Sequence, residues 1–447
     1  MQADLLIHAD WIIPVETAGT LEQHSIAIDN GRIAAIAPRS QALDQIDAKE
    51  SVTLPGHALI PGLINAHTHS PMSLFRGLAD DMPLMSWLND HIWPAESRWV
   101  HEEFVMDGSR LAIAEMLRGG TTCFNDMYFY PDVTGRVAAQ AGIRAIVGLI
   151  VIDFPSAWAG DADGYFDRAI AVHDLFRNDP LVGTAFAPHA PYSVADAPLR
   201  RVGTLANELE LPIHMHVHET AAEVRGSLEQ TGKRPIGRLH ELDLISPALL
   251  AVHMTQLERD EIALFADCGA QVVHCPESNL KLASGHCPVG TLLDAGINVA
   301  LGTDGAASNN DLDMLGEMQS AALQAKGMGA DACALPAEQA LRMASLNGAR
   351  ALGIDAETGS LAVGKSADIV AVDLSQPETQ PVFNPISQIV YAAGREQVRH
   401  VWVAGRQVLR NRTLTTIDLD LTLQHAAVWR DRILDKSADS PAGSGAK

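Results

Sequence analysis

Eight short strand-like runs, separated by helical stretches, occupy the middle of the 447-residue chain and restrict its possible folds more than any other feature. The helical stretches, such as Glu102–Arg118, Pro198–Leu209 and Leu257–Cys268, carry apolar residues at helical spacing. Eight strand–helix alternations over about 300 residues are what a (β/α)8 barrel, or TIM barrel, requires. An open doubly wound α/β sheet is the alternative, but no GxGxxG motif follows the first strand. The eight predicted strands are Ala58–Asn65, Thr121–Asn125, Arg144–Val151, Val182–Ala187, Pro212–Val217, Leu249–His253, Gln271–His274 and Asn298–Leu301.

Strand-like runs also lie outside the predicted barrel, at both ends of the chain. Near the N-terminus, Ser25–Ile36 places Asn30-Gly31 between two alternating apolar runs, which is a strong signal for a tight hairpin turn. Near the C-terminus, Val398–Leu409 alternates in the same way and turns at Ala404-Gly405. Because chain termini usually lie close together, these segments can pair into one small β-sandwich domain. The predicted domains are this β-sandwich from residues 1–59 and 365–436, the barrel from residues 60–364, and a disordered tail at residues 437–447.

The charge and composition of the chain exclude several classes of protein. A formal net charge of −23 at pH 7 disfavours nucleic acid as a partner, because phosphate binding needs a positive surface. No stretch approaches the roughly 18 uninterrupted apolar residues of a membrane span, and Met1–Leu6 has no basic residue of a secretory signal. The five cysteines form no CxxC pair, which argues against a disulfide framework or a Cys-rich zinc site. We therefore expect an acidic cytoplasmic protein that binds neither nucleic acid nor membranes.

Histidines end five of the eight predicted strands, and an aspartate ends another. In a barrel enzyme the chemistry takes place at the C-terminal ends of the strands. His67 and His69 share one face of an extended strand, so that both can bind one metal ion, although an isolated pair can also be two packed core histidines. Many imidazoles converging on one rim have no simple structural explanation, and together they predict a metal site. The strand-end residues are His67, His69, His189, His214, His216, His218, His253, His274 and Asp304.

The residue types at these strand ends indicate which metal and which chemistry to expect. Neutral imidazoles with one carboxylate suit zinc, and also iron(II) or manganese. A catalytic zinc keeps one position open for water and lowers the pKa of that water towards roughly 7. A general acid or base must stand beside the water, and Glu219 is the nearest candidate in the sequence. The spacing leaves open which of His214, His216 and His218 is a ligand, because all three share one strand face.

Several motifs, taken together, resemble the amidohydrolase superfamily over nearly the whole chain. They are PGLINAHTH at the first strand, HVHE at the fifth, GTDG at the eighth, and the histidines that end the fourth and sixth strands. The run HTHSPMSLFRGLADDMPLMSWL (His67–Leu88), followed by WPAE (Trp93–Glu96), is more narrowly similar to the methylthioadenosine/S-adenosylhomocysteine deaminase branch. Near relatives of that branch are s-triazine hydrolases and guanine and cytosine deaminases.

The resemblance implies a single metal ion and a definite set of ligands. In these families the ligand on strand five precedes the catalytic glutamate by three positions, which pairs His216 with Glu219 and leaves His214 and His218 as packing or supporting residues. Binuclear relatives have a bridging lysine or glutamate at the end of strand four, where this chain has His189. The expected cofactor is therefore one divalent ion, with zinc favoured over iron(II) or manganese. The implied ligands are His67, His69, His216 and Asp304.

The reaction that the resemblance implies is hydrolytic deamination of an adenine ring. Asp304 takes a proton from the metal-bound water, and the resulting hydroxide attacks C6 of the purine. His253 orients the hydroxide and stabilises the developing charge, while Glu219 protonates ring N1 and assists the departure of ammonia. Each implied substrate contact also has a structural alternative: Glu96 could cap a helix, His189 could be a core histidine, and Trp87 could be a core aromatic residue. The implied contacts are Glu96 with the ribose hydroxyls, His189 with the nucleoside and Trp87 with its thioether end.

One departure from the family pattern bears on the substrate. Family members that accept S-adenosylhomocysteine are expected to bind its carboxylate with an arginine in the loop after strand three. In this chain that loop, residues 151–163 (VIDFPSAWAGDAD), contains three aspartates and no lysine or arginine. An uncharged methylthio group would fit Phe154, Pro155 and Trp158 there. We therefore predict a preference for methylthioadenosine, with S-adenosylhomocysteine and adenosine as further candidate substrates.

Other functions are compatible with parts of the pattern. The same hydroxide could displace a halide or alkylamine from an s-triazine, but Glu96 together with Glu219 favours a nucleoside, because a triazine has no ribose diol. Deamination of guanine or cytosine is a nearby alternative. A barrel that serves only as an assembly scaffold should lack ligands, whereas here the implied set is complete. Apolar faces on the barrel helices favour a homodimer or homotetramer as the assembly.

Overall fold

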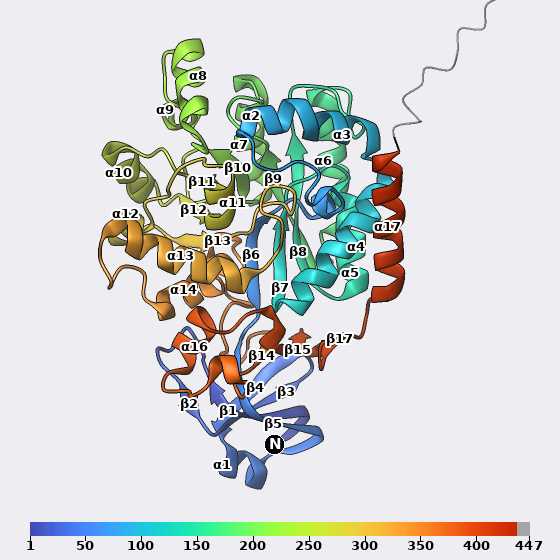
Figure 1. Ribbon diagram of the computed structural model, residues 1–447, viewed down its shortest axis with the longest axis vertical. Coiled ribbons are helices and arrows are strands. Elements are labelled where there is room, and N and C mark those ends of the chain that lie inside the picture. The colour runs from blue at the N-terminus through green and yellow to red at the C-terminus, as the bar shows by residue number, and fades with distance from the viewer. Residues whose placement is uncertain (436–447) are drawn as a thin grey trace, which may run out of the picture.

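The computed structural model describes residues 1–435, and an eight-stranded parallel sheet forms its centre (Figure 1). The strands are β6 (Leu63–Thr68), β7 (Thr121–Asp126), β8 (Arg144–Val151), β9 (Val182–Pro188), β10 (Ile213–Val217), β11 (Leu249–His253), β12 (Gln271–His274) and β13 (Val299–Leu301). They neighbour one another in chain order, and β13 returns to β6, where the Asp304 N–H donates to the His67 carbonyl at 3.0 Å. This confirms the predicted (β/α)8 barrel. The predicted disordered tail, residues 437–447, lies outside the described residues.

Helices connect the strands and cover the outside of the barrel, as parallel β–α units require. Buried apolar side chains of strands and helices form one continuous core, which includes Phe124, Phe166, Phe186 and Phe265. The helical spacing in the sequence located α4 and the C-terminal ends of α7 and α10 correctly. The helices are α4 (Glu102–Arg118), α5 (Pro131–Ala141), α6 (Ala162–Phe176), α7 (Asp196–Leu209), α8 (Ala221–Thr231), α9 (Pro235–Glu241), α10 (Arg259–Cys268), α11 (Pro276–Lys281), α12 (Val289–Asp294), α13 (Met314–Gly329), α14 (Ala337–Met343) and α15 (Leu346–Ala351).

The two ends of the chain meet in a second, mixed sheet below the barrel (Figure 1). Its strands are β1 (Gln2–Ile12), β2 (Leu21–Glu22), β3 (His24–Asp29), β4 (Arg32–Pro38), β5 (Asp47–Pro61), β14 (Ile369–Asp373), β15 (Val398–Val403), β16 (Arg406–Arg410) and β17 (Thr413–Leu414), with α1 (Arg39–Gln45) and α16 (Pro385–Tyr391) alongside in the chain. The N- and C-terminal parts join where β5 pairs with β14, Ile60 opposite Val370. This confirms that the end segments pair, whereas the domain limits given above stay a prediction.

Both hairpin turns predicted from the sequence are present, and they touch each other. Asn30 and Gly31 have φ of 48° and 76°, and Ala404 and Gly405 have φ of 47° and 75°. This left-handed backbone suits two-residue hairpin turns. A Cβ on Gly31 would lie 2.6 Å from the carbonyl oxygen of Ala404, so glycine is required there for the two chain ends to approach so closely.

The structure corrects the first predicted strand. The apolar run Ala58–Asn65 is divided between two sheets: its first residues end β5, and β6 begins only at Leu63. Gly62 lies at the corner between them, where an added Cβ would lie 1.9 Å from Oγ1 of Thr122. Both pieces are fully buried, so the sequence stays apolar on both sides of the corner. Hydrophobicity alone therefore cannot predict that one strand ends and another begins there.

The segment between β6 and β7 lies across the C-terminal end of the barrel (Figure 1). It contains the 3-10 turn η1 (Ser70–Phe75), α2 (Leu84–Trp87), the π-helical turn η2 (Leu88–Ile92) and α3 (Trp93–Trp99). Nζ of Lys281 on α11 lies 2.6 Å from Oδ1 of Asp80, which ties this segment to the opposite rim. It therefore covers the end of the barrel at which chemistry is expected.

The last described helix, α17 (Leu419–Leu434), packs against α4 rather than against the small sheet. Nε1 of Trp429 donates to Oδ2 of the buried Asp107 at 3.0 Å, and Nδ1 of His425 lies 2.9 Å from Oδ1 of the same carboxylate. Across residues 1–435, no helix combines the length and the apolar character needed to span a membrane.

Buried His400 in the small sheet leads to a prediction about acid stability. Burial, with neighbouring His57 and Arg399, lowers the pKa of His400 to about 4. Because the unfolded chain binds a proton near pH 6.5 and the folded protein does not, this site should reduce the free energy of unfolding by up to about 1.4 kcal/mol per pH unit between pH 6.5 and 4. Replacing His400 by Gln should flatten this dependence, measured by urea unfolding at pH 7, 6 and 5. The exposed His91→Gln variant should keep the wild-type slope, and equal slopes in all three proteins would contradict the prediction.

Candidate metal centre and catalytic site

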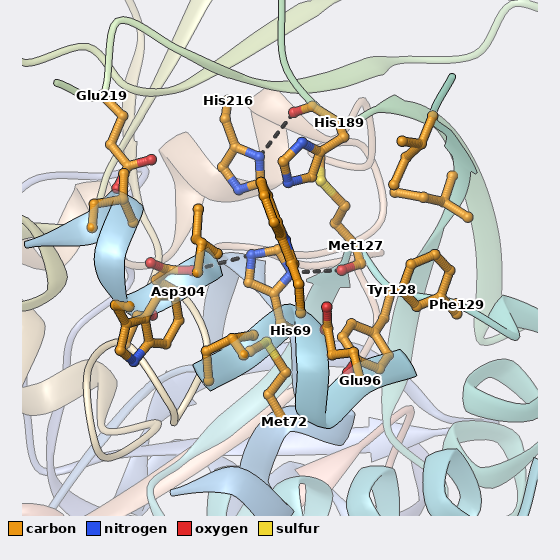
Figure 2. A pocket seen from close by; sticks show the side chains of 18 of the residues that line it. His69, Met72, Glu96, Met127, Tyr128, Phe129, His189, His216, Glu219 and Asp304 are labelled. Atoms are coloured by element: carbon orange, nitrogen blue, oxygen red, sulfur yellow. Dashed lines mark hydrogen bonds and ion pairs between the residues drawn. The ribbon is translucent and has the colours of Figure 1, made fainter. Parts of the chain in front are cut away.

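Four side chains from three strand ends converge at the C-terminal mouth of the barrel. Figure 2 shows three of them, His69, His216 and Asp304. His67 lies on β6 and His69 just after it, His216 lies on β10, and Asp304 follows β13. Nε2 of His67 and Nε2 of His69 each lie 3.2 Å from Oδ1 of Asp304, and Nε2 of His67 lies 3.3 Å from Nε2 of His216. The four potential ligand atoms all lie within 4.8 Å of one another. The residues implied as metal ligands are therefore brought together, in a group that can hold a metal ion.

Backbone carbonyls fix the orientation of two of these rings. Nδ1 of His69 lies 2.5 Å from the carbonyl oxygen of Met127, and Nδ1 of His216 lies 2.8 Å from that of His189 (Figure 2). When Nδ1 donates its hydrogen to a carbonyl, the lone pair of Nε2 is left free for a metal ion. Both rings are therefore oriented as ligating histidines are.

Electrostatics favours the protonation state that a metal site needs at three of the four residues. At His69, burial lowers the pKa, but the hydrogen bond and charge of Asp304 outweigh it and raise the pKa to about 9, so a metal ion must displace a proton from this ring. Burial lowers the pKa of His67 to about 4 and the pKa of His216 well below its ordinary value, so both rings are neutral at pH 7. Burial opposes ionisation of Asp304, but hydrogen bonds from His67 and His69 hold its pKa well below its usual range. Oγ of Ser278 also donates to Oδ2 of Asp304 at 2.6 Å. Neutral imidazoles and one carboxylate are a donor set that fits zinc.

Glu219 and His253 border the same mouth from neighbouring strands. Glu219 follows the end of β10 and His253 is the last residue of β11. Oε2 of Glu219 lies 3.9 Å from Nε2 of His253, and Nδ1 of His253 lies 2.9 Å from Oδ1 of Asn279 on α11. Burial raises the pKa of the Glu219 carboxyl, and His253 opposes this shift. A carboxyl group suited to carrying a proton and an oriented imidazole thus stand beside the four-residue group.

A cavity of about 790 Å³ opens onto this group. The residues implied as substrate contacts all line it: Glu96 on α3, His189 after β9, and Trp87 at the end of α2. Figure 2 shows Glu219 and Glu96 on opposite sides of His69. The cavity can therefore present one end of a substrate to Glu219 and the other end to Glu96.

Each implied substrate contact also has local partners. Burial raises the pKa of Glu96 to about 7, and the neighbouring Tyr128 side chain opposes this shift. Nδ1 of His189 lies 2.8 Å from Oγ of Ser193, and burial lowers the pKa of His189 to about 3, so its ring is neutral. Nε1 of Trp87 donates to a backbone carbonyl at 3.1 Å, so this residue both packs in the covering segment and faces the cavity.

Other strand-end histidines do not enter the four-residue group. Nε2 of His214 lies 2.8 Å from Nδ1 of His67, so His214 supports a ligand from behind. His218 is turned towards α9, where its Nε2 accepts a weak hydrogen bond from the Ile236 N–H at 3.4 Å. Buried His274 does not line the cavity, and its Nδ1 has no partner among the described residues.

Some residues of the site were not found from the sequence. Ser278 and Asn279 reach Asp304 and His253 from the start of α11. They stand directly after the seventh strand, so their position at a strand end was a usable signal. Tyr128, which lies beside Glu96, could not be recognised as a site residue in the same way. An aromatic residue after a strand is usually interpreted as part of the hydrophobic core.

The loop after β8 agrees with the sequence interpretation only in part. Phe154 lines the main cavity and an adjoining one of about 710 Å³, which Pro155 also borders. Trp158 lines neither cavity: its ring packs 5.0 Å from the ring of Tyr130, under the guanidinium of Arg168. The expectation that Trp158 contacts the substrate was therefore wrong, because this ring belongs to the packing around α6.

Known proteins resemble this chain along nearly its whole length. A 5-methylthioadenosine/S-adenosylhomocysteine deaminase from Teredinibacter turnerae is 48% identical over 431 residues, covering 96% of this chain and 98% of the relative. A crystal structure of an adenosine deaminase from Xanthomonas campestris with bound zinc is 54% identical, with a TM-score of 0.96 over 97% of this chain and 99% of that one.

A more distant likeness and a family model complete the comparison. An atrazine chlorohydrolase from Arthrobacter aurescens, complexed with zinc, has a TM-score of 0.88 over 95% of this chain and 100% of that one. At 23% identity this likeness shows the fold alone. A family model described as "Amidohydrolase family" matches residues 58–408, which include the whole barrel and the four-residue group. The chain therefore belongs to the amidohydrolase family.

Proposed function

We propose that this protein is a metal-dependent aminohydrolase that converts 5′-methylthioadenosine and water to the inosine analogue and ammonia. The observation that carries the proposal is the placement of Glu219 and His253 beside the four-residue group, on the wall of one cavity. Relatives named as 5-methylthioadenosine/S-adenosylhomocysteine deaminases, at 48% identity over almost the whole length, support the substrate class.

The cofactor we propose is a single zinc ion held by His67, His69, His216 and Asp304. The donor set supports zinc, as does the zinc in the crystal structure of the relative at 54% identity. A count of one ion is supported by His189, because the end of β9 offers no lysine or glutamate as a bridging ligand. When bound, zinc supplies hydroxide at neutral pH by lowering the pKa of a coordinated water.

The residues around the site divide the proton transfers between them. Asp304 accepts the proton that the attacking water loses, and its ionised state at neutral pH suits this role. Glu219 gives a proton to ring N1 of the purine, takes up the proton of the new hydroxyl group on C6, and passes it to the departing amine. The proton held by Asp304 then restores the Glu219 carboxyl, whose raised pKa supports a group that is easily protonated. His253, held by Asn279, orients the attacking water towards C6.

The other end of the cavity would bind the sugar. Glu96 accepts hydrogen bonds from the two ribose hydroxyls, for which a carboxylate is well suited. His189 contacts the nucleoside, and Trp87 packs against its thioether end. All three residues line the same cavity as Glu219, which supports one substrate spanning all of them.

The 5′ substituent is proposed to be small and uncharged. Phe129, Phe154 and Trp93 line both the main cavity and the adjoining one. Among the described residues that line these two cavities, none is a lysine or an arginine. The carboxylate of S-adenosylhomocysteine would therefore lose water without gaining a cationic partner, whereas a methylthio group fits the aromatic walls. Assembly as a homodimer or homotetramer and location in the cytoplasm stay predictions.

A panel of substrates tests the proposal directly. Zinc-loaded protein is mixed in parallel wells with methylthioadenosine, S-adenosylhomocysteine, adenosine, guanine and a chloro-triazine, and the absorbance change and released ammonia are measured. We expect kcat/KM to be highest for methylthioadenosine and at least about tenfold lower for S-adenosylhomocysteine, because the buried carboxylate has no partner.

A variant sharpens this comparison. Ala157→Arg adds a cation at an exposed position of the adjoining cavity and should move the preference towards S-adenosylhomocysteine, while adenosine turnover stays near wild type. Absence of turnover of every adenosine compound, with stoichiometric metal bound, would overturn the proposed function. Equal kcat/KM for the two thio-nucleosides would overturn only the proposed preference.

A further inference from the structure

The backbone at the end of β10 takes an unusual conformation just before Glu219. His218 has φ of 54°, in the left-handed region that non-glycine residues seldom occupy. On one side of the chain, the His218 carbonyl accepts from the Thr255 N–H at 3.0 Å and the Glu219 carbonyl accepts from Oγ1 of Thr255 at 2.7 Å. A conformation of this kind persists only where surrounding groups hold it in place.

The carboxylate of Glu223 holds the opposite side of the same backbone. It accepts hydrogen bonds from the N–H of His218 at 3.1 Å and from the N–H of Glu219 at 2.7 Å. Glu223 reaches back because it lies in the first turn of α8, whose N-cap Thr220 accepts from the Glu223 N–H at 3.2 Å. The helix start therefore holds the peptide groups that lead into Glu219.

By contrast, the carboxyl group of Glu219 has only long contacts within the protein. Oγ of Ser284 lies 3.4 Å from its Oε1, and Nε2 of His253 lies 3.9 Å from its Oε2. The position of this carboxyl at the cavity wall is thus set mainly by its backbone (Figure 2). A side chain that transfers protons to two different atoms in turn works best when its backbone is held in place and its carboxyl group can move between the two atoms.

We propose that Glu223 is a positioning residue, which holds the Glu219 peptide so that the Glu219 carboxyl reaches both ring N1 and the leaving amine. Glu223 itself lies outside the cavity lining and touches neither the four-residue group nor the cavity. Its effect on the reaction is therefore exerted through Glu219 alone. This inference rests on the proposed function for the catalytic part, and on the hydrogen bonds of Glu223 for the structural part.

The test uses the full-length zinc-loaded protein and a double-mutant cycle. In Glu223→Gln one of the two N–H groups loses its acceptor, because an amide presents only one oxygen. We expect kcat for methylthioadenosine to fall about 10- to 100-fold, with KM changed less than about threefold and zinc content unchanged. The control is Glu229→Gln, which removes an exposed carboxylate from the same helix and should behave as wild type.

The second arm of the cycle separates positioning from general destabilisation. In a Glu219→Gln background, adding Glu223→Gln should lower the residual kcat by less than about twofold, because the group that Glu223 positions is already inactive. Hydrogen exchange of the segment around Glu219, followed by mass spectrometry, should be faster in Glu223→Gln than in Glu229→Gln. A fully multiplicative loss in the double variant, wild-type kcat in Glu223→Gln, or loss of zinc from it would overturn the proposal.

The hydrogen-exchange readout keeps the two proposals distinguishable. If the wild-type protein deaminates no adenosine compound but exchange near Glu219 increases in Glu223→Gln, the proposed function fails while the structural hold by Glu223 stands. If wild type is active and neither exchange nor kcat responds to Glu223→Gln, the positioning role fails and the proposed function is unaffected.

Discussion

Replacing Glu219 by glutamine is expected to lower kcat for methylthioadenosine by about 10²- to 10⁴-fold, the usual contribution of a general acid or base. The amide has nearly the same shape as the carboxyl but cannot give a proton to ring N1. Because Glu219 is not one of the four clustered ligands, zinc content should stay at the wild-type value. The loss of the adenine absorbance band, ammonia release and metal analysis together measure these quantities.

Glu229→Gln on the neighbouring helix serves as the matched control for the charge change and should retain full activity. Two results would speak against the role of Glu219. Turnover within tenfold of wild type would show that another group supplies the proton, and loss of zinc would show that Glu219 acts on the metal site instead.

Replacing His216 by glutamine is expected to remove both zinc and activity. His216 contributes one of the four converging donors, and its ring stands fixed by the carbonyl of His189. His214 and His218 on the same strand segment make a graded comparison. His214→Gln should reduce zinc affinity or activity about 10- to 100-fold, because His214 only supports the ligand His67. His218→Gln should retain zinc, because its ring faces α9.

Zinc per chain and kcat after dialysis against a zinc buffer give the ranking of these three variants. Wild-type apoprotein prepared with a chelator should lose turnover and regain it when zinc is added back. Full zinc occupancy in His216→Gln, or complete zinc loss in His218→Gln with a folded protein, would contradict the assignment of ligands on β10.

Much of the barrel follows from hydrophobic runs that end abruptly. β8, β11 and β12 begin and end at the predicted residues, because helical or polar segments bound each run on both sides. The first strand is the exception, since Ala58–Asn65 stays apolar across a change of sheet. Only the contact of Gly62 with Thr122, residues far apart in the sequence, reveals where the chain turns.

The site shows the same limit of local patterns. On an ideal strand His214, His216 and His218 point to one side, so spacing could not choose between them. In the structure the left-handed φ of His218 takes that ring off the shared face, a feature that depends on α8 and β11. The position of Asn279 after the seventh strand could have marked it as a site residue, but its partner, His253, is set by the packing of α11.

The pairing of β5 with β14 has a consequence for the order in which the protein is made. A ribosome releases the N-terminal strands long before β14 is synthesised. Until then the edge of β5 around Ile60 is unpaired, because its partner Val370 does not yet exist. Pairing between residues so distant in the chain is slow, and an exposed apolar edge invites association with other chains. Nascent chains that stall before β14 should therefore be the species that depend most on chaperones.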